Sequence, residues 1–164
     1  MKYFAYGSNM SLLRLTARVP SAKRIGLYQL NGHRLRFDKA SHDGSGKGNI
    51  EQTNNQEDKV FGAIFDIADA EKAALDAVEG LGVGYEIKII TVEDYLGNQQ
   101  QAFTYYATDI NPLLSPYYWY LNHVIIGAKE IGVPKNYLEN IQSVNSIEDP
   151  NTQRSAQEYA IYLK

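Results

Sequence analysis

The sequence contains no cysteine, and this absence excludes several kinds of site. Without thiols, the 164 residues cannot form a disulfide framework, a cysteine nucleophile or a cysteine-ligated metal centre. Long apolar runs are missing as well, because no stretch approaches the ~18 apolar residues that span a bilayer. The run from Tyr3 to Tyr6 is also too short for the core of a secretion signal. We therefore expect a cytoplasmic protein with no membrane partner.

Excess positive charge is also lacking, since the formal net charge is −3 and the pI is about 5.6. Nucleic-acid binding typically requires a basic stripe on a basic domain, so we expect no nucleic-acid partner. The cations that do gather lie at or near two predicted strands: Lys23, Arg24, Arg34, Arg36 and Lys39. We expect them to cover a solvated face of the sheet.

Patterns for a metal or a nucleotide cofactor are incomplete. The three histidines, His33, His42 and His123, lack the short spacing of metal ligands, so we expect no metal site. The glycine-rich segment 43–48 departs from a phosphate-binding loop, because Gly46-Lys47 is followed by glycine and position 41 is serine. We interpret this segment as an exposed loop, with a flexible lid as the alternative, and expect no cofactor.

The length and the order of the elements predict a single domain over residues 1–164. A core of this size buries roughly 70% of the surface of the unfolded chain. Strand patterns come first and helix patterns last, with one helix between strands, which favours an α+β fold. We expect a curled, mostly antiparallel β-sheet or barrel with flanking helices.

Individual elements follow from local signals. Strands are predicted at residues 3–6, 22–30, 33–37, 49–53, 60–67, 85–92 and 101–107. Asn31-Gly32 predicts a hairpin between the second and third of these, and the last two should pair across Gly97-Asn98. Ser115-Pro116 should begin a long helix that ends near Gly132, and Pro134 should begin another toward Gln142. The tail 151–164 is predicted to form a late strand or helix.

The segment Tyr3-Phe4-Ala5-Tyr6-Gly7-Ser8-Asn9-Met10 is the strongest candidate for a site. Its aromatic strand breaks at Gly7, and Ser8, Asn9 or Ser11 can cap the helix that Leu12, Leu13 and Leu15 suggest. The unpaired amides at a helix start can hold a carboxylate or a developing oxyanion without a basic side chain. The alternative is an ordinary strand-to-helix turn.

Glu79 is the candidate acid or base. It falls at the end of a predicted helix that Asp69 can cap and Gly80 can end, so its carboxylate meets the negative end of the helix dipole. That field disfavours ionisation and suits a proton shuttle. Against this, the helical wheel predicts an apolar stripe of Ala70, Ala74, Ala77, Val78 and Leu81, which places Glu79 on the opposite, solvated face.

Tyrosine is common, with thirteen residues, and it is concentrated at Tyr117, Tyr118, Trp119 and Tyr120. Such a run can line a pocket, stack on a ligand or form a dimer contact. A core helix with one solvent-exposed edge also explains this concentration of aromatic residues.

Four motifs in order resemble the gamma-glutamylcyclotransferases and their AIG2-like relatives. They are Tyr6-Gly7-Ser8-Asn9 after the first strand, Glu79-Gly80 after a helix, Ser115-Pro116 with Tyr118, and Gly127-Ala128-Lys129-Glu130 followed by Gly132-Val133-Pro134. A sister group that acts on gamma-glutamylamines typically has Thr-Leu where this chain has Ser8-Asn9. Two segments differ in length from those of familiar members of the family: the turn between Glu79 and Tyr85, and the stretch after Tyr118. These differences would reshape the side of the pocket that holds the leaving group.

The resemblance implies a fold, a reaction and site residues. It implies a gamma-glutamylcyclotransferase-like fold in which Glu79 is the catalytic acid/base, with substrate-binding residues Tyr3, Tyr6, Gly7, Ser8, Asn9, Tyr85 and Tyr118. The reaction converts a small gamma-glutamyl substrate to 5-oxoproline and a free amino acid or amine, without a cofactor. Two alternatives stay open: the same reaction on a gamma-glutamylamine or biosynthetic gamma-glutamyl product, and a non-catalytic metabolite-binding module. We expect a monomer or homodimer.

Overall fold

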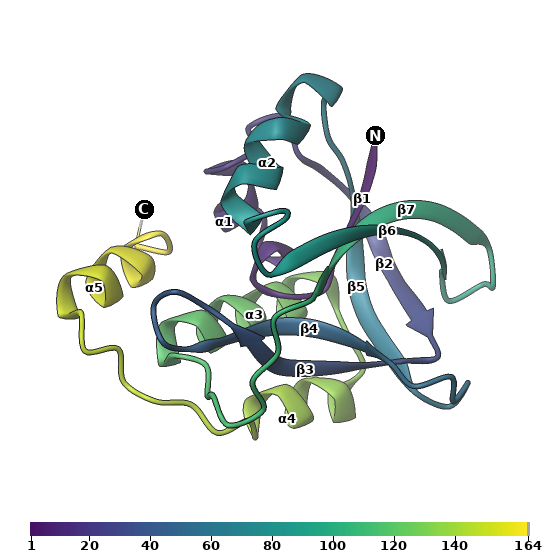
Figure 1. Ribbon diagram of the computed structural model, residues 1–164. Helices are drawn as coiled ribbons and strands as arrows, with labels where there is room; N and C mark the ends of the chain where they lie inside the picture. The colour runs from purple at the N-terminus through teal and green to yellow at the C-terminus, as the bar shows by residue number, and fades with distance from the viewer. Residues whose placement is uncertain (164) are drawn as a thin grey trace.

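Residues 1–163 are described by the computed structural model, and they form an α+β fold built around a closed barrel (Figure 1). The strands are β1 Lys2–Ala5, β2 Lys23–Asn31, β3 His33–Ala40, β4 Gly46–Gln52, β5 Lys59–Asp66, β6 Tyr85–Glu93 and β7 Gln99–Ala107. The helices are η1 Ser8–Met10, α1 Leu12–Thr16, η2 Asp69–Glu71, α2 Lys72–Glu79, α3 Tyr118–Ile131, α4 Lys135–Gln142 and α5 Thr152–Ala160, where η marks a 3₁₀ turn. The predicted fold class is confirmed.

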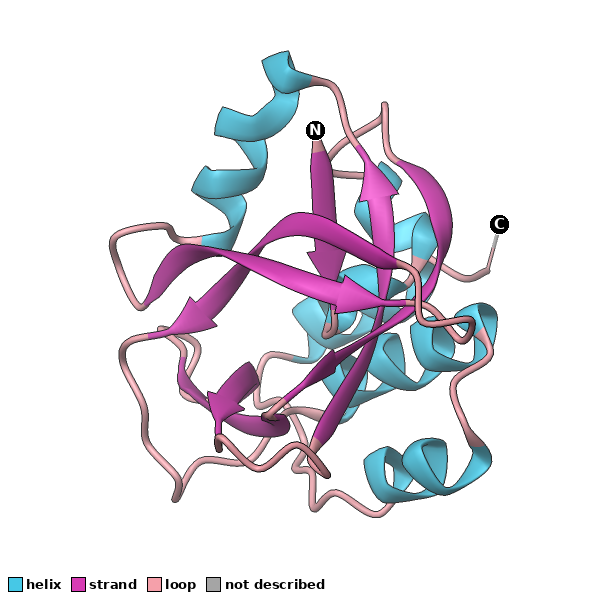
Figure 2. Cartoon of the chain, turned by 90° about the vertical axis from the view of Figure 1, so that its right-hand side faces the viewer, coloured by secondary structure: helices cyan, strands magenta, loops and turns pink. Residues whose placement is uncertain are grey.

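The barrel has the strand order β1-β5-β2-β6-β7, and β1 closes it by pairing in parallel with β7 at Tyr3 and Phe103. The other neighbouring strands are antiparallel. Figure 2 shows these strands curling around one another with the helices on the outside. At Gly62 of β5, an added Cβ would lie 2.4 Å from the Ala5 carbonyl oxygen and 2.7 Å from the Phe4 ring. This glycine therefore lets β1 press against β5.

The hairpin predicted between residues 22–30 and 33–37 is wrong. β2 pairs with β5 and β6, whereas β3 pairs with β4 in a separate two-stranded ribbon. Only Gly32 separates β2 from β3, and its amide and carbonyl bond to Asp58 and Thr53. A tight hairpin needs two central residues, so the chain turns a corner here from the barrel into the ribbon.

Several helix and strand predictions are met and others shift. The strand at 60–67 and the pairing of 85–92 with 101–107 are confirmed. Gly80 and Gly132 end α2 and α3 in the left-handed region, with φ +74° and +75°. The long helix begins at Tyr118, later than expected, and the predicted loop at 43–48 gives way to β4 from Gly46.

The elements at the two ends of the chain complete the fold. The tail contains helix α5 rather than a strand, at the left of Figure 1. Helices α1 and α2 lie together at the top of that view, and α3 lies behind the β3–β4 ribbon with α4 below it. Within residues 1–163, every helix is too short or too polar to cross a membrane.

Candidate functional site

The chain after β1 forms a tight turn that lines a small polar cavity. The turn is the 3₁₀ segment η1, in which the Met10 amide donates to the Gly7 carbonyl at 3.0 Å. Gly7, Ser8 and Asn9 all line the cavity, and their amides take part in none of the loop and cap hydrogen bonds of residues 1–163. They therefore remain available to an acceptor, as predicted for this segment.

The predicted capping of this turn is wrong in detail. Helix α1 starts after Ser11, and neither its N-cap nor that of η1 has a capping hydrogen bond from a side chain. Asn9 does not cap because its side chain is engaged elsewhere. Its Nδ2 donates to Tyr3 Oη at 3.1 Å and to Glu79 Oε1 at 2.8 Å, and its Oδ1 accepts from Arg18 at 3.0 Å.

Glu79 lies at the end of α2 with its side chain turned toward this cavity. Only 16% of the side chain is exposed, and Arg18 Nη1 approaches Oε1 at 3.4 Å. Asn9 and Arg18 both contact Oε1 of Glu79, whereas Oε2 accepts no hydrogen bond from residues 1–163. One carboxyl oxygen is thus anchored and the other is left for a ligand.

The apolar stripe predicted for this helix is wrong. Lys72, Leu75, Asp76 and Glu79 form the inward face: Leu75 is fully buried, and Asp76 accepts from the Tyr105 hydroxyl at 2.5 Å. The Lys72 ammonium lies 4.9 Å from the centre of the Phe103 ring. Val78, on the predicted stripe, is 50% exposed. The wheel failed because the inward face of α2 combines the buried Leu75 with polar side chains that contact Phe103 and Tyr105 of β7.

Five tyrosines wall the cavity. They are Tyr3, Tyr6, Tyr85, Tyr105 and Tyr120. The Tyr6 hydroxyl donates to the Tyr105 carbonyl at 2.7 Å, and the Tyr85 hydroxyl donates to the Gly48 carbonyl at 2.5 Å. Burial raises the pKa of Tyr3, Tyr6 and Tyr85 far above their usual range. These hydroxyls therefore stay neutral, and they supply hydrogen bonds rather than charge.

Tyr118 is the one predicted site residue that lies elsewhere. It is 52% exposed and does not line the cavity, whereas Tyr120, two residues along α3, does. The Tyr120 hydroxyl accepts from the Gly48 amide at 2.8 Å, and a Cβ at Gly7 would lie 3.3 Å from it. Because successive residues of a helix face different directions, the aromatic run of the sequence could not indicate which tyrosine points inward.

Sequence reasoning also missed Tyr105, Gly48 and Arg18 as members of this site. Tyr105 is buried in β7, and no local motif marked it. Gly48 is buried in β4, and the glycine-rich segment that contains it was interpreted as an exposed loop. Arg18 lies beyond α1, and its contact with Glu79 joins residues 61 positions apart. Such groups are identified only when distant segments are brought together.

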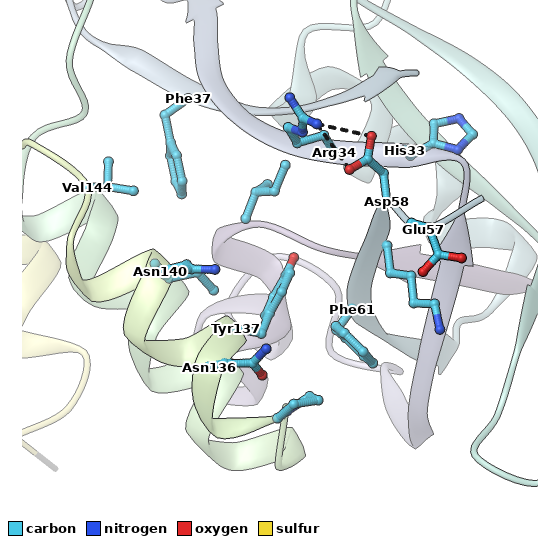
Figure 3. Close-up of a pocket in the computed structure, with 14 residues that line it drawn as sticks. His33, Arg34, Phe37, Glu57, Asp58, Phe61, Asn136, Tyr137, Asn140 and Val144 are labelled. Atoms are coloured by element: carbon cyan, nitrogen blue, oxygen red, sulfur yellow. Dashed lines mark hydrogen bonds and ion pairs between the residues drawn. The ribbon is translucent and has the colours of Figure 1, made fainter. Parts of the chain in front are cut away.

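A larger cavity of about 570 Å³ lies between β3, β5 and α4 (Figure 3). None of the predicted site residues lines it. Its Asp58 carboxylate is occupied by Arg34, at 3.0 and 3.1 Å. The cavity at Glu79 measures only about 20 Å³, room for about one water molecule. The smaller cavity nevertheless holds the anchored carboxylate and the unpaired amides, so it is the better candidate for chemistry.

The fold and this cavity together define a class of protein. A barrel that brings one anchored carboxylate and a turn with unpaired amides to a tyrosine-walled cavity has the parts of an enzyme acting on a small molecule. The AIG2-like family model matches residues 59–141, slightly more than half of the chain, and the chain belongs to this family.

Comparison with individual proteins gives the same result. The chain is 28% identical to gamma-glutamylcyclotransferase of Bos taurus over 152 residues, which covers 87% of this chain and 77% of the bovine protein. It is also 28% identical to the Homo sapiens gamma-glutamylcyclotransferase, with the same coverage. A solved structure of a gamma-glutamyl cyclotransferase superposes with a TM-score of 0.86 at 25% identity, and the match covers all of this chain and 99% of the other.

Proposed function

We propose that this protein catalyses gamma-glutamyl cyclotransfer with Glu79 as the acid/base. The observation that carries the proposal is the hydrogen bond of 2.8 Å between Asn9 and Glu79, which brings the carboxyl group to the turn of unpaired amides. Relatives named for this activity cover most of the chain, which supports the proposal.

The reaction closes a ring within the substrate. The α-amine nitrogen of the gamma-glutamyl group attacks the side-chain amide carbonyl carbon, so a new C–N bond forms and the original C–N bond breaks. The products are 5-oxoproline and a free amine or amino acid. One proton leaves the attacking nitrogen and one reaches the leaving nitrogen, so no oxidant or cofactor is consumed.

Each part of the cavity has a task in this reaction. Glu79 Oε2 takes the proton from the attacking nitrogen and returns it to the leaving nitrogen, while Oε1 stays fixed by Asn9. The amides of Gly7, Ser8 and Asn9 stabilise either the negative oxygen of the tetrahedral intermediate or the substrate α-carboxylate. Tyr3, Tyr6 and Tyr85 enclose the glutamyl chain in a ring-closing shape, and this orientation accounts for several kcal/mol of the barrier.

The substrate enters through a movement of the cavity walls, because a cavity of about 20 Å³ is smaller than a folded glutamyl group. The turn at residues 80–84 is suited to this movement. Gly80, Gly82 and Gly84 all have positive φ, and Val83 is 61% exposed.

The cellular setting is part of the proposal. We propose a cytoplasmic location, with which the absence of cysteine is compatible. A gamma-glutamyl substrate places the protein in the metabolism of gamma-glutamyl peptides, including that of glutathione.

The test is release of 5-oxoproline from gamma-glutamylalanine by the wild-type protein and by Glu79→Gln. We expect the substitution to abolish release and to preserve the fold, because Gln keeps the shape and the contact with Asn9 but cannot shuttle a proton. Glu139→Gln, at a 60% exposed side chain of α4, is the matched control and should retain full activity. An active Glu79→Gln variant would refute the role of Glu79. Binding of 5-oxoproline without turnover by the wild-type protein would favour a metabolite-binding module.

A further inference from the structure

The larger cavity, between β3, β5 and α4, arises where the β3–β4 ribbon leaves the barrel. At Gly32 the chain turns away to pair β3 with β4, so β3 diverges from β5, and α4 covers the gap without filling it (Figure 3). Its volume of about 570 Å³ lies in the range of small-molecule sites, roughly 300–1,000 Å³. Its lining residues all differ from those of the cavity at Glu79, so the proposed reaction gives it no role.

The floor of the larger cavity is apolar and partly aromatic. The rings of Phe61 and Tyr137 meet edge to face, with 5.0 Å between their centres. The apolar lining consists of Leu35, Phe37, Phe61, Pro134, Tyr137, Ile141 and Val144. Leu35, Phe37 and Phe61 are only half-buried, so a ligand that covers them would remove apolar surface from water. Aromatic rings also favour edge-to-face contact with a further ring.

The Tyr137 hydroxyl is an unsatisfied polar group in this floor. Its oxygen is buried and makes no hydrogen bond with any residue from 1 to 163. Burial raises the pKa of Tyr137, and the nearby Phe61 backbone opposes this shift, although no hydrogen bond joins the two. Figure 3 shows the hydroxyl pointing away from α4 toward β3, among the side chains that line the cavity. A buried hydroxyl without a partner costs free energy, and a ligand that supplies the partner would recover it.

The charges around the larger cavity cancel. Arg34 is paired with Asp58, and the exposed Glu57 and Lys59 contribute one charge of each sign. Burial lowers the pKa of His33 from 6.5, so its ring is neutral near pH 7. Neither an anion nor a cation therefore gains from the lining as a whole, and a charged ligand would lose its hydration on the apolar floor.

Neutral hydrogen-bonding groups are available instead. Asn136 and Asn140 lie one helical turn apart on α4, and both line the cavity (Figure 3). Each side-chain amide can donate and accept a hydrogen bond, as can the Tyr137 hydroxyl. The lining thus combines an aromatic floor with uncharged donors and acceptors.

We infer that the larger cavity is a binding site for a small uncharged molecule that joins an aromatic ring to an amide or a similar neutral group. The ring packs on Phe61 and Leu35, and the neutral group bonds to the Tyr137 hydroxyl. The inference goes beyond the proposed function, because this ligand lies apart from Glu79 and takes no part in cyclotransfer.

The test uses three probes that share a ring and differ in charge: benzamide, benzoate and benzylamine. NMR titration of the wild-type protein should give a millimolar Kd for benzamide and at least about tenfold weaker binding of the two charged probes. Benzamide should shift the backbone amide signals of Leu35, Phe61 and Tyr137. Tyr137→Phe should weaken its binding by about fivefold or more. Tyr95→Phe, at a tyrosine that is 90% exposed, is the matched control and should bind benzamide as the wild type does.

Stability gives an independent measurement on the same variant. Tyr137→Phe removes a hydroxyl without a partner, so its melting temperature should be at least that of the wild type. A clear fall in melting temperature with unchanged benzamide binding would show that the hydroxyl serves the fold, and would overturn the inference. The same holds if benzamide does not bind at millimolar concentration, or if all three probes bind equally.

Competition separates this inference from the proposed function. Addition of 5-oxoproline should leave the benzamide signals unchanged, and Glu79→Gln should bind benzamide with the wild-type Kd. Displacement of benzamide by 5-oxoproline would place the probe in the cavity at Glu79 and overturn the inference. A protein that binds benzamide but releases no 5-oxoproline would instead contradict the cyclotransferase proposal and leave the second site standing.

Discussion

Asn9 shows how much of the site depends on one side chain. Its amide group contacts Tyr3, Arg18 and Glu79, which come from β1, the segment after α1, and α2. Asn9 is 4% exposed, so these contacts are shielded from water. Its NH₂ group donates to Glu79 and its carbonyl oxygen accepts from Arg18, so the polarity of the amide sets the position of the catalytic candidate.

We predict that Asn9→Asp lowers kcat by about 10²-fold while the protein stays folded. The substitution keeps the shape but replaces a donor with an acceptor facing the Glu79 carboxylate, which repels it from its position. Steady-state kinetics on gamma-glutamylalanine measure the effect. Asn145→Asp, at an exposed position, should have wild-type kinetics, and a fully active Asn9→Asp variant would show that this contact is dispensable.

At the scale of elements, the site turn is supported by α3. Gly127 lies where η1 meets this helix, and a Cβ there would lie 2.5 Å from both Met10 Cβ and the Ser11 amide nitrogen. The absence of a side chain at position 127 therefore sets how closely the turn that carries Gly7, Ser8 and Asn9 can approach the helix that carries Tyr120.

We predict that Gly127→Ala lowers both activity and stability. The added methyl group meets backbone as well as side-chain atoms, so η1 must shift, and overpacking of this kind typically costs about 1–3 kcal/mol. Urea unfolding and 5-oxoproline release measure the two effects. Ala in the middle of a helix is otherwise favoured over Gly, so a stabilised Gly127→Ala variant would show that the contact is loose.

At the scale of the whole molecule, a buried polar cluster joins the C-terminal helix to the body. Glu158 of α5 forms an ion pair with Arg14 of α1 and lies 2.9 Å from His123 Nε2 in α3. The Tyr162 hydroxyl lies 2.6 Å from His123 Nδ1 and donates to Ser11 Oγ at 3.0 Å. The docking of α5 therefore depends on groups that titrate.

The Glu158 carboxylate and the His123 imidazole both make the docking of α5 weaker at acidic pH. Burial lowers the pKa of His123 to about 4 from 6.5, although its contact with Glu158 opposes the shift. Burial by itself raises the pKa of Glu158, but the hydrogen bond with His123 and the charge of Arg14 outweigh it and hold that pKa at about 2. In each case the unfolded chain takes up the proton at a higher pH than the folded protein does, so stability falls as pH falls.

We predict that the free energy of unfolding declines as pH drops from about 6.5 to 4 through His123, and further from about 4.5 to 2 through Glu158. In His123→Gln the first decline should become shallower, because the group that stays neutral in the folded state is gone. Urea unfolding at a series of pH values measures this slope. His42→Gln, at an exposed position, should keep the wild-type slope, and identical slopes in all three proteins would contradict the prediction.

Local patterns predicted much of the fold. The strand at 60–67, the β6–β7 pairing and the ends of α2 and α3 at Gly80 and Gly132 were predicted because alternation, turn residues and left-handed caps act within a few residues. The hairpin predicted between β2 and β3 is wrong, because strand partners are chosen by the whole sheet. The wheel of α2 misled for a similar reason, since polar side chains on its inward face contact Phe103 and Tyr105 of β7.

The sequence by itself indicated the α+β class, and its motifs made the turn at Gly7, Ser8 and Asn9 and the carboxyl group of Glu79 candidates for the site. Only the tertiary structure decided that Asn9 holds Glu79, and that Tyr105 and Tyr120 complete the cavity in place of Tyr118. It also decided that Lys39, expected on a solvated face of the sheet, is only 7% exposed. The physical reason is distance along the chain. Backbone conformation follows from neighbouring residues, whereas burial, pairing and the convergence of side chains depend on segments that meet only when the barrel closes.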